Sequence, residues 1–564
     1  MKRKILIGLS WPYANGRLHI GHVASSLPAD VLARYHRLVG NDVSFITGSD
    51  CYGTPILVAA KNEGITPLQL SDKYHAHHTA DFKSIGFTFD NYTKTTSPYH
   101  NKFVADFHAQ MYRDNPLIYA KSAMQLYCED CNKYLPDRYV EGVCPHCKEN
   151  AKGDSCDGCG KILEPEDLLE PKCKLCSGSP VPRNTRQLYL KLSALEKQIR
   201  DHYDFRKDTW ANNAVGLTGR YLNEGLIDRA ITRNIEWGVP LPADAKEIFN
   251  LDANEFNEKK IYIWAENVLG YLSATAEFCE KTGRDWREFL LSSSGKHNCE
   301  GCPGAKKASC KSMPPLHYYV HAKDNIPFHS IILPGLLLAN SRGEQSYHLP
   351  DIIVSSEYVK IVGDKMSKSK GNLITIEELV SQYDTDMIRY YFLRNVNDKK
   401  DVNFTQDDFI AVINAELVNG FGNLVNRTLS FIKTKMDGTL KSSKPDKAVI
   451  TEIEKTFTDV GELIHAGKIN RALVRGYELV TTGNKLFDEY APWKSIKENP
   501  EKCNQDIFTI VTIIANLANI LSPFIPNATK KIAEWLSVPQ DDFNIHIPTK
   551  TITINEIEVL FKRL

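Results

Sequence analysis

The sequence predicts an α/β protein in which a doubly wound parallel sheet is split by an insertion and followed by an α-helical bundle. Lys4–Leu9 and Asp42–Thr47 are short apolar runs on either side of a loop and a helix, the order that opens such a sheet. Residues 121–182 are rich in Cys, Pro, Gly and charge and lack helical periodicity. From about Asp408 onward, helical periodicity replaces the strand signals. The first part is therefore Rossmann-like, a fold that binds nucleotides at the C-terminal ends of its strands.

These patterns divide the chain into five predicted regions. They are the first half of the Rossmann-like domain (1–120), a connective insertion (121–235), the second half of that domain (236–355), a linking subdomain (356–407) and the helical domain (408–564). We expect a helix to open at His19–Gly21. A strand is expected over Thr551–Leu560, where apolar and polar residues alternate.

The segment that most resembles a membrane span is Ile507–Ile525. Polar residues nevertheless fall on one helical stripe of it, namely Thr509, Thr512, Asn516 and Asn519. Pro523 and Pro526 then end the run. We expect a buried helix of the bundle rather than a membrane helix.

The chain has 564 residues, with 69 Lys plus Arg and 69 Asp plus Glu. It therefore lacks a global positive field, and nucleic-acid binding would need a local basic patch. The apolar stretch within Met1–Pro12 is too short for a secretory signal. We expect a cytoplasmic protein, whose cysteines bind metal rather than form disulfides.

Two short motifs far apart in the chain carry the chemistry. His19-Ile20-Gly21-His22 places two imidazoles in the first turn of a helix, whose N-terminus suits phosphate, and Gly21 leaves room for a ligand. In Lys365-Met366-Ser367-Lys368-Ser369, two lysines of a glycine-bearing loop can neutralise a leaving pyrophosphate. Alone, the motifs are also consistent with incidental histidines and a solvated basic loop. Together they indicate adenylate formation from ATP, and the absence of a Gly-x-x-x-x-Gly-Lys-Ser/Thr sequence argues against a P-loop ATPase.

Eight cysteines form four Cys-x-x-Cys pairs, which are Cys128/Cys131, Cys144/Cys147, Cys156/Cys159 and Cys173/Cys176. Each pair supplies half of a tetrahedral thiolate site, so the eight fit two structural zinc ions. An iron–sulfur cluster and redox dithiols are the alternatives. Four thiolates leave no open position, so we expect no catalytic zinc. A further group (His297, Cys299, Cys302 and Cys310) holds only one such pair, and loose surface cysteines are favoured there over a third metal site.

The two motifs resemble the signatures of class I aminoacyl-tRNA synthetases. Pro12-Tyr13-Ala14-Asn15-Gly16 before the first motif, together with the cysteine-rich insertion, resembles the methionyl-tRNA synthetase family over nearly the whole chain. In members with one zinc, the ligands correspond to Cys144, Cys147, Cys156 and Cys159. The resemblance therefore implies nested pairing, in which a second zinc takes Cys128, Cys131, Cys173 and Cys176.

The resemblance also implies the substrate sites. Methionine would lie among Trp11, Tyr13, Asp50, Trp264, Asn267, Val268, Tyr271, Phe328 and His329. Asp50 would meet its ammonium group, and the aromatic rings would enclose its thioether. ATP, accompanied by Mg²⁺, would contact Gly21, Asp324, Lys365, Ser367 and Lys368, with Asp324 on the ribose.

Catalytic roles follow from the same resemblance. His19 and His22 would stabilise the transition state, and Lys365 and Lys368 the leaving pyrophosphate. The chain departs from the family at Trp11, where many members have leucine, at Asn267-Val268, where many have Ala-Pro, and at Tyr52, where they have histidine. These departures leave the shape of the pocket open.

In the helical region, Asn423 and Arg427 are spaced i and i+4 and can contact one ligand together. Trp493, which follows Pro492, can stack on an unpaired base. Each alone would be interpreted as a surface polar pair or a core aromatic. By the resemblance, these positions recognise the methionine anticodon.

The resemblance thus implies a methionine–tRNA ligase that forms methionyl-adenylate and charges the terminal adenosine of tRNA(Met). The isoleucine, valine and leucine enzymes share the motifs but carry large editing insertions. Small nucleotidyltransferases use a similar histidine loop but are shorter and lack the helical domain. A zinc-knuckle RNA-binding protein would not explain Lys365–Ser369. We expect no membrane partner, and we expect a monomer, because many members continue beyond Thr551–Leu560 into a dimerisation domain.

Overall fold

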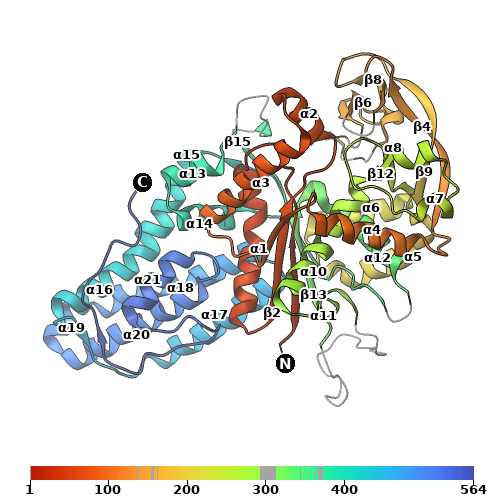
Figure 1. The fold of residues 1–564 in the computed structure, drawn as a ribbon. Coiled ribbons are helices and arrows are strands. Elements are labelled where there is room, and N and C mark those ends of the chain that lie inside the picture. Colours follow the sequence, from red (N-terminus) through yellow and green to blue (C-terminus); the bar gives the residue numbers. More distant parts are fainter. Residues whose placement is uncertain are drawn as a thin grey trace.

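The computed structural model describes residues 2–135, 139–153, 156, 158–159, 161, 163–292, 313–342, 345–361, 364–365 and 373–564. A five-stranded parallel sheet forms its centre (Figure 1). The strands lie in the order β14 (Ile352–Ser356), β13 (Leu316–Ala322), β1 (Lys4–Leu9), β2 (Asp42–Ser49) and β3 (Asn91–Lys94). The chain builds outward from β1 in one direction and returns to add β13 and β14 on the other side. The predicted doubly wound parallel sheet is therefore confirmed.

Helices cover both faces of this sheet, so its strands are apolar on both sides. In β1, Ile5 and Ile7 face the core beneath α1 (Ile20–Leu38), whereas Leu6 faces α4 (Pro98–Tyr112) and α10 (Gly270–Thr282). The other helices of this part are α2 (Thr54–Glu63), α3 (Pro67–Ser84), α5 (Leu192–Arg206), α6 (Asn212–Glu224), α7 (Ala245–Ile248), α8 (Ala253–Glu258), α9 (Ile263–Glu266), α11 (Arg287–Leu290) and α12 (Leu333–Asn340).

The insertion is built on a long antiparallel pair, in which residues 118–127 of β4 (Ile118–Cys128) pair with residues 181–190 of β9 (Val181–Leu190). The short strands around it are β5 (Lys133–Tyr134), β6 (Val140–Val143), β7 (Asn150–Lys152), β8 (Leu169–Cys173), β10 (Arg229–Ala230), β11 (Thr232–Asn234) and β12 (Lys259–Ile261). The insertion and the helical domain lie on opposite sides of the sheet (Figure 1).

A second small sheet follows β14, with β15 (Val359–Ile361) between β16 (Asp364–Lys365) and β17 (Val402–Phe404). Its helices are α13 (Ile376–Gln382) and α14 (Thr385–Asn395). The helical domain then comprises α15 (Gln406–Val412), a π-helical continuation over Ile413–Gly422, α16 (Asn423–Lys435), α17 (Lys447–His465), α18 (Ile469–Tyr490), α19 (Pro492–Glu498), α20 (Pro500–Ile520) and α21 (Pro526–Leu536).

Helix α20 is buried along most of its length, which explains its apolar composition. Its polar stripe binds irregular chain: Asn516 Nδ2 donates to the carbonyl of His546 and its Oδ1 accepts the N–H of His546, both at 2.8 Å. Asn519 Nδ2 donates to the carbonyl of Asn544 at 2.9 Å. None of the helices that the structure describes is both long and apolar enough to span a membrane.

The strand expected over Thr551–Leu560 is wrong for most of its length. Only β19 (Ile552–Thr553) forms, paired with β18 (Thr439–Leu440). The alternation is real, because Ile552 and Ile554 are buried. However, the partner strand ends after two residues, so the ladder of hydrogen bonds cannot continue.

Candidate active site

A cavity of about 650 Å³ opens at the C-terminal edge of the central sheet. Its walls include residues that directly follow four strands, namely Ser10 and Trp11 after β1, Asp50 after β2, Lys323 and Asp324 after β13, and Glu357 and Tyr358 after β14. The order of the strands reverses at β1, where neighbouring connections leave in opposite directions and open a crevice. The topology alone therefore places polar side chains from distant segments around one ligand-sized space.

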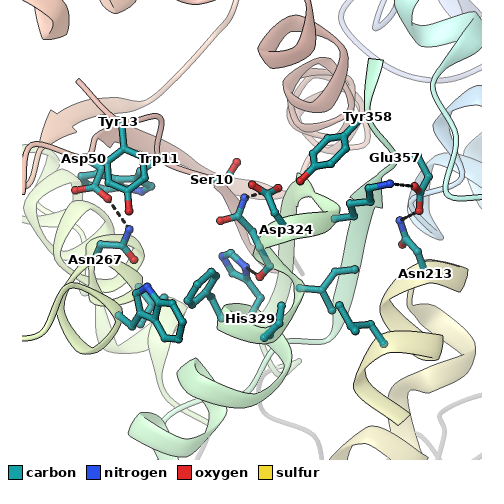
Figure 2. A pocket seen from close by; sticks show the side chains of 18 of the residues that line it. Ser10, Trp11, Tyr13, Asp50, Asn213, Asn267, Asp324, His329, Glu357 and Tyr358 are labelled. Atoms are coloured by element: carbon teal, nitrogen blue, oxygen red, sulfur yellow. Dashed lines mark hydrogen bonds and ion pairs between the residues drawn. The ribbon is translucent and has the colours of Figure 1, made fainter. Parts of the chain in front are cut away.

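All nine residues predicted to hold methionine line this cavity, together with Asp324. Figure 2 shows Trp11, Tyr13, Asp50 and Asn267 at one end and Asp324, Tyr358 and Glu357 toward the other. The cavity can thus hold an elongated ligand with chemically different ends.

Asp50 is fully buried at the first end. Its Oδ2 accepts a hydrogen bond from Asn267 Nδ2 at 2.8 Å and its Oδ1 accepts the N–H of Tyr52 at 3.2 Å. Main-chain bonds from Ala14 N–H to Asp50 O and from Asp50 N–H to Pro12 O, at 2.8 and 2.9 Å, hold it beside the loop after β1. A carboxylate fixed in this way can pair with a ligand ammonium group.

An aromatic wall follows. The Tyr271 hydroxyl donates to His329 Nε2, and His329 Nδ1 donates to the carbonyl of Asn325, both at 2.8 Å. Burial lowers the pKa of His329 to about 4, so the ring is neutral at pH 7. Trp264 and Phe328 meet edge to face with centroids 4.6 Å apart. The result is an uncharged, polarizable surface.

Two glycines account for the tryptophan at position 11. A Cβ atom at Gly48 or Gly270 would lie 2.5 or 2.8 Å from an indole carbon of Trp11. The absence of both side chains therefore makes room for an indole where the family resemblance implies leucine. Sequence reasoning missed these glycines. Tyr52 is turned elsewhere, since its hydroxyl donates to Asn101 Oδ1 at 3.0 Å and its ring packs on Trp237.

His19 is the N-cap of α1 rather than a residue of its first turn. Its Nδ1 accepts the N–H of Gly21 at 3.1 Å, and His22 Nδ1 accepts the N–H of His19 at 3.2 Å. Since both Nδ1 atoms accept, each neutral ring carries its proton on Nε2. The motif therefore presents two imidazole donors at a helix N-terminus, with ring centroids 4.0 Å apart.

The chain after the lysine motif returns to this helix. Ile20 N–H donates to the carbonyl of Ile374, and Ile376 N–H donates to the carbonyl of Leu18, both at 3.1 Å. The histidine motif thus lies beside the segment into which Lys365–Ser369 leads. The backbone of Lys365 belongs to β16, whereas its side chain and Ser367 and Lys368 lie outside the described residues, as do His297, Cys299, Cys302 and Cys310.

An ion-pair network at the second end was not predicted. Lys323 Nζ lies 2.6 Å from Glu357 Oε2 and 2.7 Å from Asp401 Oδ1, and Lys360 Nζ lies 2.8 Å from Asp401 Oδ2. Burial opposes the charge of Lys323, but the bonds from Asp401 and Glu357 outweigh it and raise its pKa. The network joins β13 to the small sheet that carries β16. Only the position of Lys323 beside Asp324 could have signalled it.

The eight knuckle cysteines form two groups, each with its ligand atoms within 4.8 Å of one another: Cys128, Cys131, Cys173 and Cys176, and Cys144, Cys147, Cys156 and Cys159. This is the nested grouping that the resemblance implies. Four Sγ···Sγ distances across the pairs are 3.4 to 3.9 Å. A tetrahedral zinc site with Zn–S bonds of about 2.3 Å requires roughly 3.8 Å between sulfurs. The donor sets therefore fit zinc, and Cys156 of the second group also lines the cavity.

The predicted RNA-contacting residues meet around a residue that was not predicted, Phe487. The guanidinium of Arg427 lies 4.2 Å from the centroid of the Phe487 ring, and Trp493 lies 6.3 Å from it on the other helix. Arg427 also pairs with Asp488 at 2.7 Å. Trp493 is 51% exposed although Pro492 before it is buried, and Asn423 is exposed. Helices α16 and α19, which carry these residues, lie at the end of the domain far from the sheet (Figure 1).

Comparisons with known proteins agree with this arrangement. Residues 5–429 match the family described as tRNA synthetases class I (M), and residues 437–557 match the anticodon binding domain of methionyl tRNA ligase. A methionine–tRNA ligase of Bacillus cereus is 41% identical over 564 residues, covering 99% of this chain and 96% of its own. Another from Alkaliphilus oremlandii is 39% identical over 560 residues, covering 99% and 97%. The structure of Mycobacterium tuberculosis methionyl-tRNA synthetase in complex with methionyl-adenylate superposes with a TM-score of 0.76, at 20% identity and full coverage of both chains.

The fold and the family match define a class I tRNA synthetase, with a split nucleotide-binding domain and a helical domain behind it. Within that class, the chain belongs to the methionyl-tRNA synthetase family.

Proposed function

We propose that this chain is a methionine–tRNA ligase that activates methionine with ATP and transfers the methionyl group to the terminal adenosine of tRNA(Met). The observation that supports this most is a single cavity at the strand C-terminal ends. It gathers a buried carboxylate, a neutral aromatic wall and Asp324 beside the N-terminus of α1.

Recognition of methionine is assigned to the first end of the cavity. Asp50 pairs with the substrate ammonium, and Asn267 holds the carboxylate in place. Trp264, Tyr271 and Phe328 surround the thioether, for which each sulfur–aromatic contact contributes about 0.3–1.5 kcal/mol. Because His329 stays neutral, the wall offers no charge to a competing acidic or basic side chain.

Activation is assigned to the region between the two ends. The methionine carboxylate attacks the α-phosphorus of ATP, and pyrophosphate leaves on the opposite side. The Nε2–H groups of His19 and His22 donate to the phosphoryl oxygens as charge develops, and Gly21 leaves space for them. Asp324 holds the ribose, while Lys365, Ser367 and Lys368 close on the pyrophosphate, which Mg²⁺ accompanies.

Zinc and tRNA complete the assignment. Two zinc ions would cross-link knuckles that have only a small core of their own. Asn423, Arg427, Pro492 and Trp493 contact the anticodon. The cytoplasmic location and the monomeric state stay predictions from the sequence.

The test is amino-acid-dependent ATP–pyrophosphate exchange, run with each of the twenty amino acids and without tRNA on zinc-replete protein. Exchange with methionine alone is the expected result. Exchange with another amino acid would overturn the roles of Trp264, Tyr271 and His329. Exchange with none would remove the ligase assignment and favour a zinc-knuckle RNA-binding protein.

A further inference from the structure

A second cavity, of about 660 Å³, lies between the edge of the sheet and the helical domain. Its walls come from β14, the start of α6, the end of α14 and the turn between α17 and α18. It shares no lining residue with the active-site cavity, although Asn212 lines one and Asn213 the other. We call it the junction groove.

The groove follows the edge of β14, the outermost strand on this side of the sheet, and all of residues 353–356 line it. The Ile353 carbonyl accepts Ala211 N–H at 2.9 Å, and Glu357 N–H donates to the Asn397 carbonyl at 3.0 Å. Main-chain groups alternate in direction along a strand, so Ser355, halfway between, directs its N–H toward the same edge.

Ser355 also carries an unsatisfied donor. Its Oγ is buried without a hydrogen-bond partner, and the residue is only 3% exposed. A buried hydroxyl without a partner is costly, because water has been removed and nothing replaces it. A ligand oxygen in the groove would satisfy this hydroxyl.

The opposite wall is positively charged. The N-terminus of the 22-residue helix α18 lines the groove and has no side-chain cap, so its N–H groups and helix dipole face the cavity. Lys468 and Arg471 lie at this terminus, and Lys207 and Lys399 line the groove as well. Asp208 and Asp398 do not balance these four cations, and Asp398 already accepts two hydrogen bonds from Asn212, at 2.7 and 2.8 Å.

One feature of the groove could oppose an anion, namely the carbonyl end of α14. The side chain of Asn470 already donates to the carbonyls of Leu393 and Arg394 in the last turn of that helix. The negative end of α14 is thus capped from within the protein, while the positive end of α18 is not.

We propose that the junction groove binds a backbone phosphate of the tRNA through Ser355, the N-terminus of α18, Lys468 and Arg471. This rests on the proposed function. A tRNA that reaches both the cavity at the sheet and Trp493 at the far end of the helical domain crosses the junction between them (Figure 1). Phosphate contacts position an RNA without reading its sequence.

The test compares Ser355→Ala and the double variant Lys468→Ala/Arg471→Ala with the wild type. Lys447→Ala/Lys455→Ala is the matched control, because it removes two exposed lysines of α17 outside the groove. Equilibrium tRNA binding is measured across a salt series, alongside methionine-dependent exchange and urea unfolding. The groove double variant should bind tRNA roughly ten-fold more weakly, with a salt slope smaller by about one to two. The control should lose much less, and exchange should be unchanged throughout.

Ser355→Ala separates binding from folding. Because its hydroxyl is unpaired in the free protein, the substitution should leave the urea midpoint equal or higher and still weaken tRNA binding. Wild-type tRNA affinity in both groove variants would overturn the proposal. So would variants that lose only thermal protection by inorganic phosphate, since the groove would then hold a small anion. Failure of exchange in the wild type concerns the proposed function, because the binding measurement does not require it.

Discussion

Arg389 and Asp30 form an ion pair at 2.8 Å in which neither side chain is exposed. The same guanidinium donates to the carbonyls of Phe524, at 2.8 Å, and Pro523, at 3.0 Å, at the corner between α20 and α21. Asp30 lies on α1, which begins at the histidine motif, and Arg389 lies on α14 of the linking subdomain. One buried side chain therefore ties the helix of the active site to the domain assigned to the anticodon.

Replacing this arginine should be costly. Arg389→Ala leaves Asp30 buried with less charge compensation, and should lower the free energy of unfolding by about 3–5 kcal/mol. Arg34→Ala is the control, since Arg34 contacts the same carboxylate at 2.7 Å but is 21% exposed, and should cost about 1 kcal/mol or less. Urea unfolding measures both. Equal losses would contradict a special role for the buried pair.

The charge of Asp50 should govern methionine affinity. Asp50→Asn keeps the shape but removes the partner of the ammonium group, so kcat/KM for methionine in exchange should fall about 10–100-fold. Asn267→Ala keeps the charge and should lower it only a few-fold. The methionine dependence of exchange at saturating ATP distinguishes them. A change confined to the KM for ATP would contradict this assignment.

The two knuckles should differ in function although they share ligand chemistry. Cys159→Ser and Cys176→Ser each remove the last thiolate of one group, and each should lower the zinc content by one equivalent. Only the first group reaches the active-site cavity, through Cys156 and Lys152. Exchange should therefore fall further in Cys159→Ser. Equal exchange at equal zinc loss would show that the contact with the cavity is unimportant.

Trp493 should act on tRNA alone. Loss of one stacked base costs about 1–3 kcal/mol, so Trp493→Ala should raise the KM for tRNA(Met) roughly 5–150-fold while methionine-dependent exchange stays unchanged. Trp493→Phe, which keeps a ring, should recover most of the loss. If exchange falls in parallel, the tryptophan supports the fold rather than the RNA.

Acidification should destabilise the fold well above the pKa of ordinary carboxylates. Burial lowers the pKa to about 3 or 4 for His36, His100, His108, His202, His317 and His329. Unfolded histidine titrates near pH 6.5, so unfolding takes up protons between about pH 6.5 and 4, and stability is lost as the pH falls through that window. Burial raises the pKa of Glu166, Glu266 and Asp386, which offsets this only in part. The urea midpoint at pH 5 should lie below that at pH 7, and an equal or higher midpoint would contradict this expectation.

Local patterns were sufficient wherever chemistry is contiguous in the chain. The apolar run Lys4–Leu9, the His19–His22 motif and the Cys-x-x-Cys spacing each specify one element or half of one site, because neighbouring residues alone set their geometry. The same reasoning failed over Thr551–Leu560, where the extent of a strand depends on a partner that the local pattern does not contain.

The sequence by itself determined the class of fold, the two motifs and the identity of the zinc-ligand residues. Only the tertiary structure decided how distant groups meet: Asn267 on Asp50, Lys323 between Glu357 and Asp401, Phe487 between Arg427 and Trp493, and the bare faces of Gly48 and Gly270 against Trp11. The physical reason is that these contacts join side chains from separate elements. Strand order and helix packing set their distances, and no periodicity within one segment encodes them.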